Sequence, residues 1–278
     1  IIDCPNLSIW KRFEQGMIEQ EFNGTLYREY GKPTDPALIM IHGLGLNKDV
    51  WQWQIPALKD KFRVISYDLY GHAQSKKPTA LPSLSMFSQQ ISGLMTFLNI
   101  DRATLIGFSL GGMIARRFAQ DAPERTERLI ILHSPHRRAP QAQAAILDRV
   151  EQARKYGSSA TVEAALERWF TANFRISNPA VMDLVRGWVL ANKMDVYHKV
   201  YSVLAEGIDE IVAPEPAISC PTLVVTGDQD FGNGPEMSHA IGAEISGSKV
   251  QILKGLRHMA LAENPRVIND IIIDFLKA

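Results

Sequence analysis

The chain has 278 residues, with 30 basic and 30 acidic side chains and two cysteines. This length is enough to bury a large core, so one α/β domain, alone or with an insertion, is expected. The balanced charge, without a long block of like charge, predicts no nucleic acid and no anionic membrane among the partners, which leaves a small molecule as the default partner.

The two cysteines, Cys4 and Cys220, form neither a metal-ligand cluster nor a C-x-x-C pair. We therefore expect no zinc site and no disulfide scaffold. Residues 1–5 lack a basic start followed by an apolar stretch, and no apolar run reaches the roughly 18 residues of a membrane span. These features predict a cytoplasmic protein without a targeting segment, and they leave a homo-oligomer open.

The apolar pattern predicts strands that are separated by helices. Residues 17–22 and 25–30 flank Asn23-Gly24, which favours the type I′ turn of a hairpin. Further short apolar segments occur at residues 37–41, 62–67, 103–108, 129–132, 223–226 and 250–253. Helix-sized stretches between them include residues 84–98, 110–121 and 267–276. This alternation predicts an α/β fold with a mostly parallel, doubly wound sheet, to which the hairpin adds an antiparallel edge.

One long segment breaks this alternation. No strand-like run occurs in it, and helical patterns cover residues 142–156, 161–174, 179–191 and 194–206. We expect a helical cap over residues 136–213, inserted into an α/β core made of residues 1–135 and 214–278. Its aromatic side chains are expected mainly in the core of the cap, and Trp169 and Trp188 are candidates for lining a substrate pocket.

A serine lies at the predicted junction between a strand and a helix. It is the centre of Gly107-Phe108-Ser109-Leu110-Gly111, in which the glycines permit a tight and strained turn. Such a turn presents the serine hydroxyl to a substrate. A serine that only caps the following helix is the alternative, but an acid and a base further along the chain favour a nucleophile.

A serine nucleophile needs a base and a third group that orients the base. Asp230 follows one predicted strand and His258 follows the next, so both are expected at the carboxyl edge of the sheet, where ligands bind. Asp228 is the alternative acid in the same loop. By default the other histidines are structural or exposed, and these are His42, His72, His133, His136, His198 and His239.

Attack on a carbonyl makes an oxyanion, which preorganised N–H groups stabilise. One predicted donor is the N–H of Leu110, at the start of a helix where N–H groups are unpaired. The other is the N–H of Leu44, in the glycine-rich loop that begins at His42. We expect His42 to support this loop by hydrogen bonding rather than to transfer protons.

These motifs resemble those of the α/β-hydrolase fold family, and the resemblance covers nearly the whole chain outside the cap. The chain order Ser109, Asp230, His258 is the order used in that family. Further matching features are His42-Gly43-Leu44-Gly45, Trp51, Asp68-Leu69-Tyr70-Gly71-His72 before Ser75, Pro123-Glu124-Arg125, Cys220-Pro221-Thr222-Leu223, and Glu263-Asn264-Pro265. Within the family, the turn around Ser109 is most similar to that of small esterases and 3-oxoadipate enol-lactonases.

The resemblance implies a serine hydrolase of small carboxylic esters or lactones, which works through an acyl-enzyme on Ser109, Asp230 and His258 without a metal or organic cofactor. Ester cleavage should then fall as the pH drops through roughly 6.5, because the base must start as neutral imidazole. The alternatives are a C–C bond hydrolase, which Phe108 and Met259 disfavour, a cofactor-free perhydrolase, an acyl-homoserine lactone hydrolase and a ligand receptor. Dehalogenases and epoxide hydrolases carry an aspartate where Ser109 stands.

Two loop positions depart from the family pattern. Ala73 and Arg257 stand where glycine is usual, and we expect Arg257 to affect access to the site or the charge around His258. Two other arginines follow a predicted strand near the site. Arg137 and Arg138 are interpreted as a solvated surface pair, with a contact to a substrate carboxylate as the alternative.

Overall fold

The structure, a computed structural model, describes residues 19–278. Within this range the strands form one eight-stranded sheet in the order β1-β2-β4-β3-β5-β6-β7-β8. Strand β2 pairs antiparallel with β1 and β4, and the other neighbours are parallel. The strands are β1 (Gln20–Phe22), β2 (Thr25–Tyr30), β3 (Ala37–Ile41), β4 (Arg63–Tyr67), β5 (Ala103–Phe108), β6 (Thr126–Leu132), β7 (Thr222–Gly227) and β8 (Lys249–Leu253). The predicted mostly parallel α/β sheet is confirmed.

The antiparallel edge of the sheet is the predicted hairpin. Asn23 and Gly24 both have positive φ, 49° and 77°, as the two central residues of a type I′ turn require. The structure begins the first strand at Gln20. Residues 17 and 18 of the predicted strand lie outside the described residues, as do Cys4 and the N-terminal segment considered above.

Helices cover both faces of the sheet, because each strand sends alternate side chains to opposite faces. In β3, Ile39 and Ile41 belong to one hydrophobic cluster, and Leu38 and Met40 belong to the other. The first cluster includes side chains of α3 (Leu84–Phe97), α4 (Leu110–Asp121) and α10 (Pro235–Glu244). The second includes side chains of η1 (Lys48–Trp53), α2 (Ile55–Leu58), α11 (Ala260–Glu263) and α12 (Pro265–Lys277). None of the helices within residues 19–278 is both long and apolar enough to cross a bilayer.

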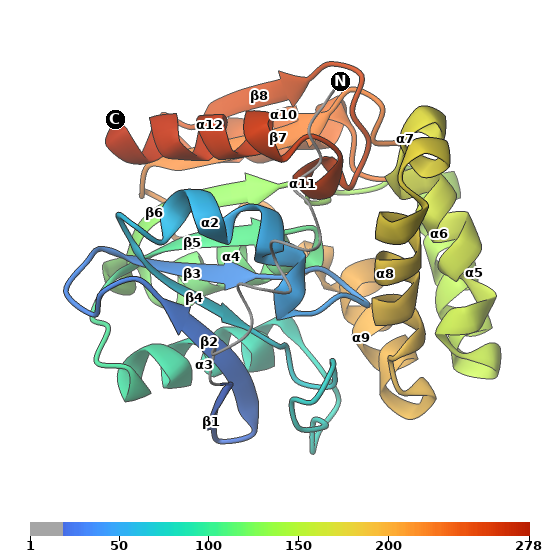
Figure 1. The fold of residues 1–278 in the computed structure, drawn as a ribbon, viewed down its shortest axis with the longest axis horizontal. Coiled ribbons are helices and arrows are strands. Elements are labelled where there is room, and N and C mark those ends of the chain that lie inside the picture. The colour runs from blue at the N-terminus through green and yellow to red at the C-terminus, as the bar shows by residue number, and fades with distance from the viewer. Residues whose placement is uncertain (1–18) are drawn as a thin grey trace.

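Five α-helices lie between β6 and β7, where the sequence predicts a cap. They are α5 (Pro140–Tyr156), α6 (Val162–Trp169), α7 (Ala172–Ser177), α8 (Pro179–Leu190) and α9 (Met194–Glu206). In Figure 1 they gather on the side of the molecule toward which the arrowheads of β3 and β8 point, which is the carboxyl edge of the sheet. We call them the cap helices; the boundaries at residues 136 and 213 stay a prediction.

The predicted helix over residues 161–174 is two helices in the structure. The backbone is extended at Phe170, and Thr171 then begins α7 by accepting a hydrogen bond from the N–H of Phe174. The hydroxyl and the N–H of Thr171 both donate to the carboxylate of Glu263. The break is therefore made by a contact with a residue 92 positions further along the chain.

Candidate active site

Ser109 stands at the turn between β5 and α4, with φ 56° and ψ −116°. A non-glycine residue in such a conformation carries strain of about 1–3 kcal/mol, which its surroundings must offset. A Cβ atom at Gly107 would lie 2.3 Å from the carbonyl oxygen of Gly111, and one at Gly111 would lie 2.1 Å from the carbonyl oxygen of Ile41. Only glycine fits at these two positions, so the two glycines permit the turn.

Neighbouring strands and loops hold the backbone of Ser109 in place. Its N–H donates to the carbonyl of Leu132 at 2.8 Å, and the hydroxyl of Ser134 donates to its carbonyl at 2.9 Å. The Ser109 side chain makes no capping hydrogen bond to α4. The capping alternative therefore does not account for Ser109, which lines a cavity instead.

The structure brings Asp230 and His258 together at the ends of β7 and β8. Nδ1 of His258 lies 2.7 Å from Oδ2 of Asp230, and both side chains are buried. The other carboxylate oxygen, Oδ1, accepts the N–H groups of Gly232 and Asn233 at 3.1 and 3.0 Å. The competing acid, Asp228, is exposed, and its carboxylate accepts a backbone N–H in a turn.

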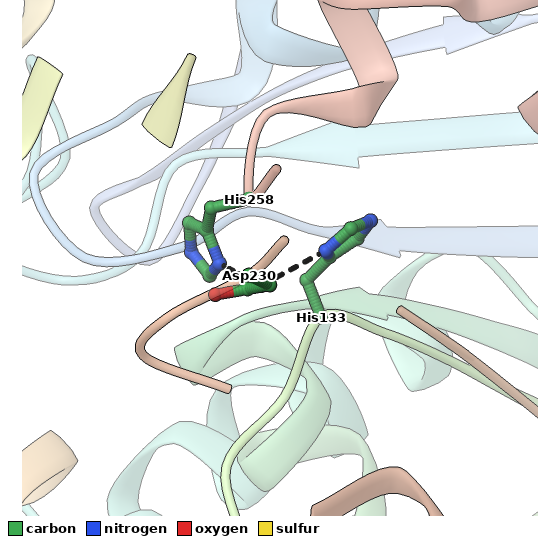
Figure 2. Close-up of side chains that lie close together, drawn as sticks. All are labelled: His133, Asp230 and His258. Atoms are coloured by element: carbon green, nitrogen blue, oxygen red, sulfur yellow. Dashed lines mark hydrogen bonds and ion pairs between the residues drawn. The ribbon is translucent and has the colours of Figure 1, made fainter. Parts of the chain in front are cut away.

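A second imidazole contacts the same carboxylate (Figure 2). His133, directly after β6, has φ 51° and places Nδ1 3.0 Å from Oδ2 of Asp230. Because an ionised carboxylate only accepts hydrogen bonds, this geometry assigns the proton to Nδ1 of each histidine. Nε2 of His133 is buried without a hydrogen-bond partner among residues 19–278. Sequence reasoning treated His133 as structural and missed this contact.

The surroundings of Asp230 keep it ionised. Burial raises the pKa of the carboxyl group, but the electrostatic interaction with His258 and the hydrogen bonds from His133 and His258 outweigh it and hold this pKa well below its ordinary value. Burial also lowers the pKa of His133, which favours its neutral form. The site therefore contains a fixed negative charge next to a neutral second imidazole.

The three side chains His133, Asp230 and His258 also form a group whose ligand-type atoms lie within 4.8 Å of one another. In a zinc site these atoms would each lie about 2.0–2.2 Å from the ion and so more than 3 Å apart. Here the two nitrogens lie 3.0 and 2.7 Å from one carboxylate oxygen, which are hydrogen-bond lengths. The arrangement fits hydrogen bonding better than metal ligation.

The predicted oxyanion donors both belong to segments next to Ser109. Leu44 lines the same cavity, and its N–H has no hydrogen-bond partner among the described residues. Leu110 is the first residue of α4, where the N–H has no partner within the helix. Neither N–H group has a hydrogen-bond partner in the described part of the chain, and their role as oxyanion donors stays a prediction.

Two buried histidines hold the loop that carries Leu44. His72 accepts the N–H of Gly45 at 3.1 Å, and His42 accepts the N–H of Leu69 through Nε2 at 3.0 Å. Nδ1 of His42 then carries the proton and donates to the carbonyl of Gly43 at 2.8 Å. Burial lowers the pKa of both histidines to about 3. Both are neutral supports of the loop, in agreement with the expectation for His42.

The cavity at Ser109 has a volume of about 90 Å³. Trp169 lines it, and its ring lies 6.0 Å from the ring of His258. Trp188, the other predicted pocket residue, does not belong to the described lining, because its ring packs against Trp53 with centroids 6.3 Å apart. The structure thus brings only one of the two tryptophans to the cavity.

The arginine that precedes His258 contacts the cap helices. Arg257 donates to the carbonyls of Glu167 and Phe170 at 2.6 and 3.0 Å, and its guanidinium lies 5.0 Å from the ring centroid of Phe231. These contacts connect the loop of His258 to the end of α6.

The arginine pair after β6 is divided between surface and cavity. Arg137 is exposed and forms an ion pair with Asp209 at 3.1 Å. Arg138 is partly buried and lines the cavity of Ser109. The interpretation as a solvated surface pair is therefore right for Arg137 and wrong for Arg138.

Comparisons with known proteins agree with the fold. A family model described as the alpha/beta hydrolase fold matches residues 36–265. The 3-oxoadipate enol-lactonase 2 of Acinetobacter baylyi is 28% identical over 251 residues, which cover 90% of this chain and 92% of that protein. The (E)-2-((N-methylformamido)methylene)succinate hydrolase of the same species is 28% identical over 232 residues, which cover 84% of this chain and 87% of that protein. The crystal structure of the enol-lactonase from Burkholderia xenovorans LB400 has a TM-score of 0.86 at 26% identity, covering 94% of this chain and 100% of that one.

Proposed function

This chain belongs to the α/β-hydrolase fold family, and we propose that it is a serine hydrolase of small carboxylic esters or lactones. The observation that carries the proposal is the 2.7 Å hydrogen bond between His258 and Asp230, in the cavity that also contains the strained Ser109. The names of the enol-lactonase relatives support an ester or lactone as the substrate class.

The first half of the reaction forms an acyl-enzyme. Nδ1 of His258 holds its proton in the bond to Asp230, so Nε2 has a lone pair that takes the proton of the Ser109 hydroxyl. The serine oxygen attacks the carbonyl carbon, and the carbonyl electron pair moves to the oxygen. The N–H groups of Leu44 and Leu110 stabilise this oxyanion.

The second half returns the enzyme to its starting state. The tetrahedral intermediate expels the alcohol, which takes the proton from His258; in a lactone this alcohol stays attached to the acyl group. Water then gives a proton to His258 and attacks the acyl carbon, and the serine oxygen leaves with that proton. Asp230 stabilises the imidazolium in both halves. Because its pKa is lowered, the carboxylate stays ionised over a wide pH range.

The proposal is tested with a fluorophosphonate probe and short p-nitrophenyl esters. The wild-type protein should be labelled once, on Ser109, and should hydrolyse the esters with many turnovers. Ser109→Ala should lose both the label and nearly all of the activity. Undiminished ester cleavage by Ser109→Ala would refute the assigned nucleophile, and labelling with almost no turnover would favour a ligand receptor over an enzyme.

A further inference from the structure

Three arginine side chains line the cavity that contains Ser109. Arg138 follows β6, Arg149 belongs to α5 and Arg168 belongs to α6, so separate segments bring them to one cavity. Among the described residues that line this cavity, Asp230 is the only one with a carboxylate. Its oxygens are already engaged by two imidazoles and two backbone N–H groups.

These arginines lack acidic partners, unlike their neighbours. None of the three forms an ion pair with a carboxylate in the part of the chain that the structure describes, whereas the adjacent Arg137 pairs with Asp209. Arg149 donates from Nε to the hydroxyl oxygen of Tyr201 at 3.2 Å. Nη1 of Arg138 is buried and has no hydrogen-bond partner within residues 19–278.

The positive charges are partly removed from water and lie near one another. Burial lowers the pKa of Arg138 to about 10, and the charge of Arg149 acts in the same direction. Burial and the charge of Arg149 also lower the pKa of Arg168. An arginine remains charged at neutral pH even so. Like charges that are held in one cavity without acidic partners are stabilised when an anion binds between them.

We propose that Arg138, Arg149 and Arg168 bind a carboxylate group of the substrate, so that the ester or lactone cleaved at Ser109 is an anionic one. This inference rests on the proposed function. A guanidinium presents a fork of N–H groups that matches the two oxygens of a carboxylate. The interpretation of Arg138 as a carboxylate contact, which the sequence left as an alternative, is thus extended to two more arginines.

The rest of the cavity limits what lies between the anionic end and the ester. Apolar side chains from the cap helices, Ile146, Ala165 and Leu204, line it together with the arginines. The cavity is small, with a volume of about 90 Å³, which favours a short acyl group. A short hydrocarbon chain with an ester at one end and a carboxylate at the other satisfies both the apolar and the charged parts of the lining.

The activity test compares two esters of equal chain length, mono-p-nitrophenyl glutarate and p-nitrophenyl pentanoate. The wild-type protein should have the higher kcat/KM for the glutarate ester. In Arg138→Leu and Arg168→Leu the ratio of the two kcat/KM values should fall by roughly 10- to 100-fold, mainly through KM of the glutarate ester. The matched control, Arg137→Leu, should keep the wild-type ratio. A wild-type preference for the pentanoate ester, or an unchanged ratio in the Arg138 and Arg168 variants, overturns the proposal.

A binding test separates this inference from the proposed function. Calorimetry on Ser109→Ala should detect glutarate, with binding weakened in the same arginine variants and retained in Arg137→Leu. If glutarate binds in this way but no ester is cleaved by the wild type, the subsite is supported and the hydrolase proposal fails. If esters are cleaved and glutarate does not bind, the subsite is refuted. Tighter binding of inorganic phosphate than of glutarate overturns the assignment to a carboxylate.

Discussion

The role of His133 beside the proposed acid, Asp230, can be tested by removing the N–H group of its imidazole. Asp230 accepts four N–H groups, from Gly232 and Asn233 on one oxygen and from His133 and His258 on the other. A hydrogen bond to a charged group contributes about 1.5–3 kcal/mol. We expect His133→Ala to lower the free energy of unfolding by at least that amount. If the same energy is lost from the transition state, kcat falls by roughly 10- to 150-fold.

The variant His133→Asn is the matched control. The amide nitrogen of asparagine occupies the position of Nδ1 on the side chain, so it can donate to Asp230 in the same way. Asparagine also tolerates the positive φ of 51° at this position. His133→Asn should therefore recover most of kcat and of the unfolding free energy that His133→Ala loses.

The two variants are compared by steady-state hydrolysis of a p-nitrophenyl ester and by urea unfolding. A loss in kcat that is equal in His133→Asn and His133→Ala would show that the volume of the ring, rather than its N–H group, matters. A wild-type kcat in His133→Ala would refute any role of this hydrogen bond in holding the carboxylate.

Three further outcomes are expected. Asp230→Asn should lower kcat by up to about 10⁴-fold, whereas Asp228→Asn should stay close to wild type in the same ester assay; the reverse would exchange their roles. Burial lowers the pKa of His42 and His72 to about 3, so between pH 6.5 and 3 the unfolded chain binds more protons than the folded one. For each histidine, the free energy of unfolding should therefore fall by about 1.4 kcal/mol for every pH unit below 6.5, down to pH 3. His72→Gln should make the slope of unfolding free energy against pH shallower by that amount in urea titrations, and an unchanged slope would contradict the buried neutral state. Gly111→Ala, whose Cβ would lie 2.1 Å from a backbone oxygen, should lower Tm sharply, and a wild-type Tm would refute the geometry of the turn.

Much of the fold could be predicted because its signals are local. Each central strand is a short apolar run, and the hairpin depends on one dipeptide. The short helices α2 and α11 were not predicted, since each has four residues and is too short to show a helical period. The break between α6 and α7 was also missed, because it depends on the contact of Thr171 with the distant Glu263.

The candidate site was predictable to the extent that its residues follow strands. Ser109, Asp230 and His258 each come directly after a parallel strand or its short turn, and the topology brings such positions to one edge. His133 also follows a strand, β6, and this signal could have identified it. Arg137 is exposed and Arg138 lines the cavity because their side chains leave the loop in different directions. No period in the sequence encodes that direction.

The bonds between the loop of His258 and the end of α6 constrain how a substrate can enter. Arg257 holds two carbonyls at that end, and the N–H of Met259 donates to the carbonyl of Trp169 at 2.9 Å. Three hydrogen bonds therefore link the loop of His258 to the wall of the cavity at Trp169. An outward movement of α6 would break these hydrogen bonds or displace the imidazole of His258. We therefore expect a substrate to reach Ser109 without an outward movement of α6, because that movement would cost these hydrogen bonds.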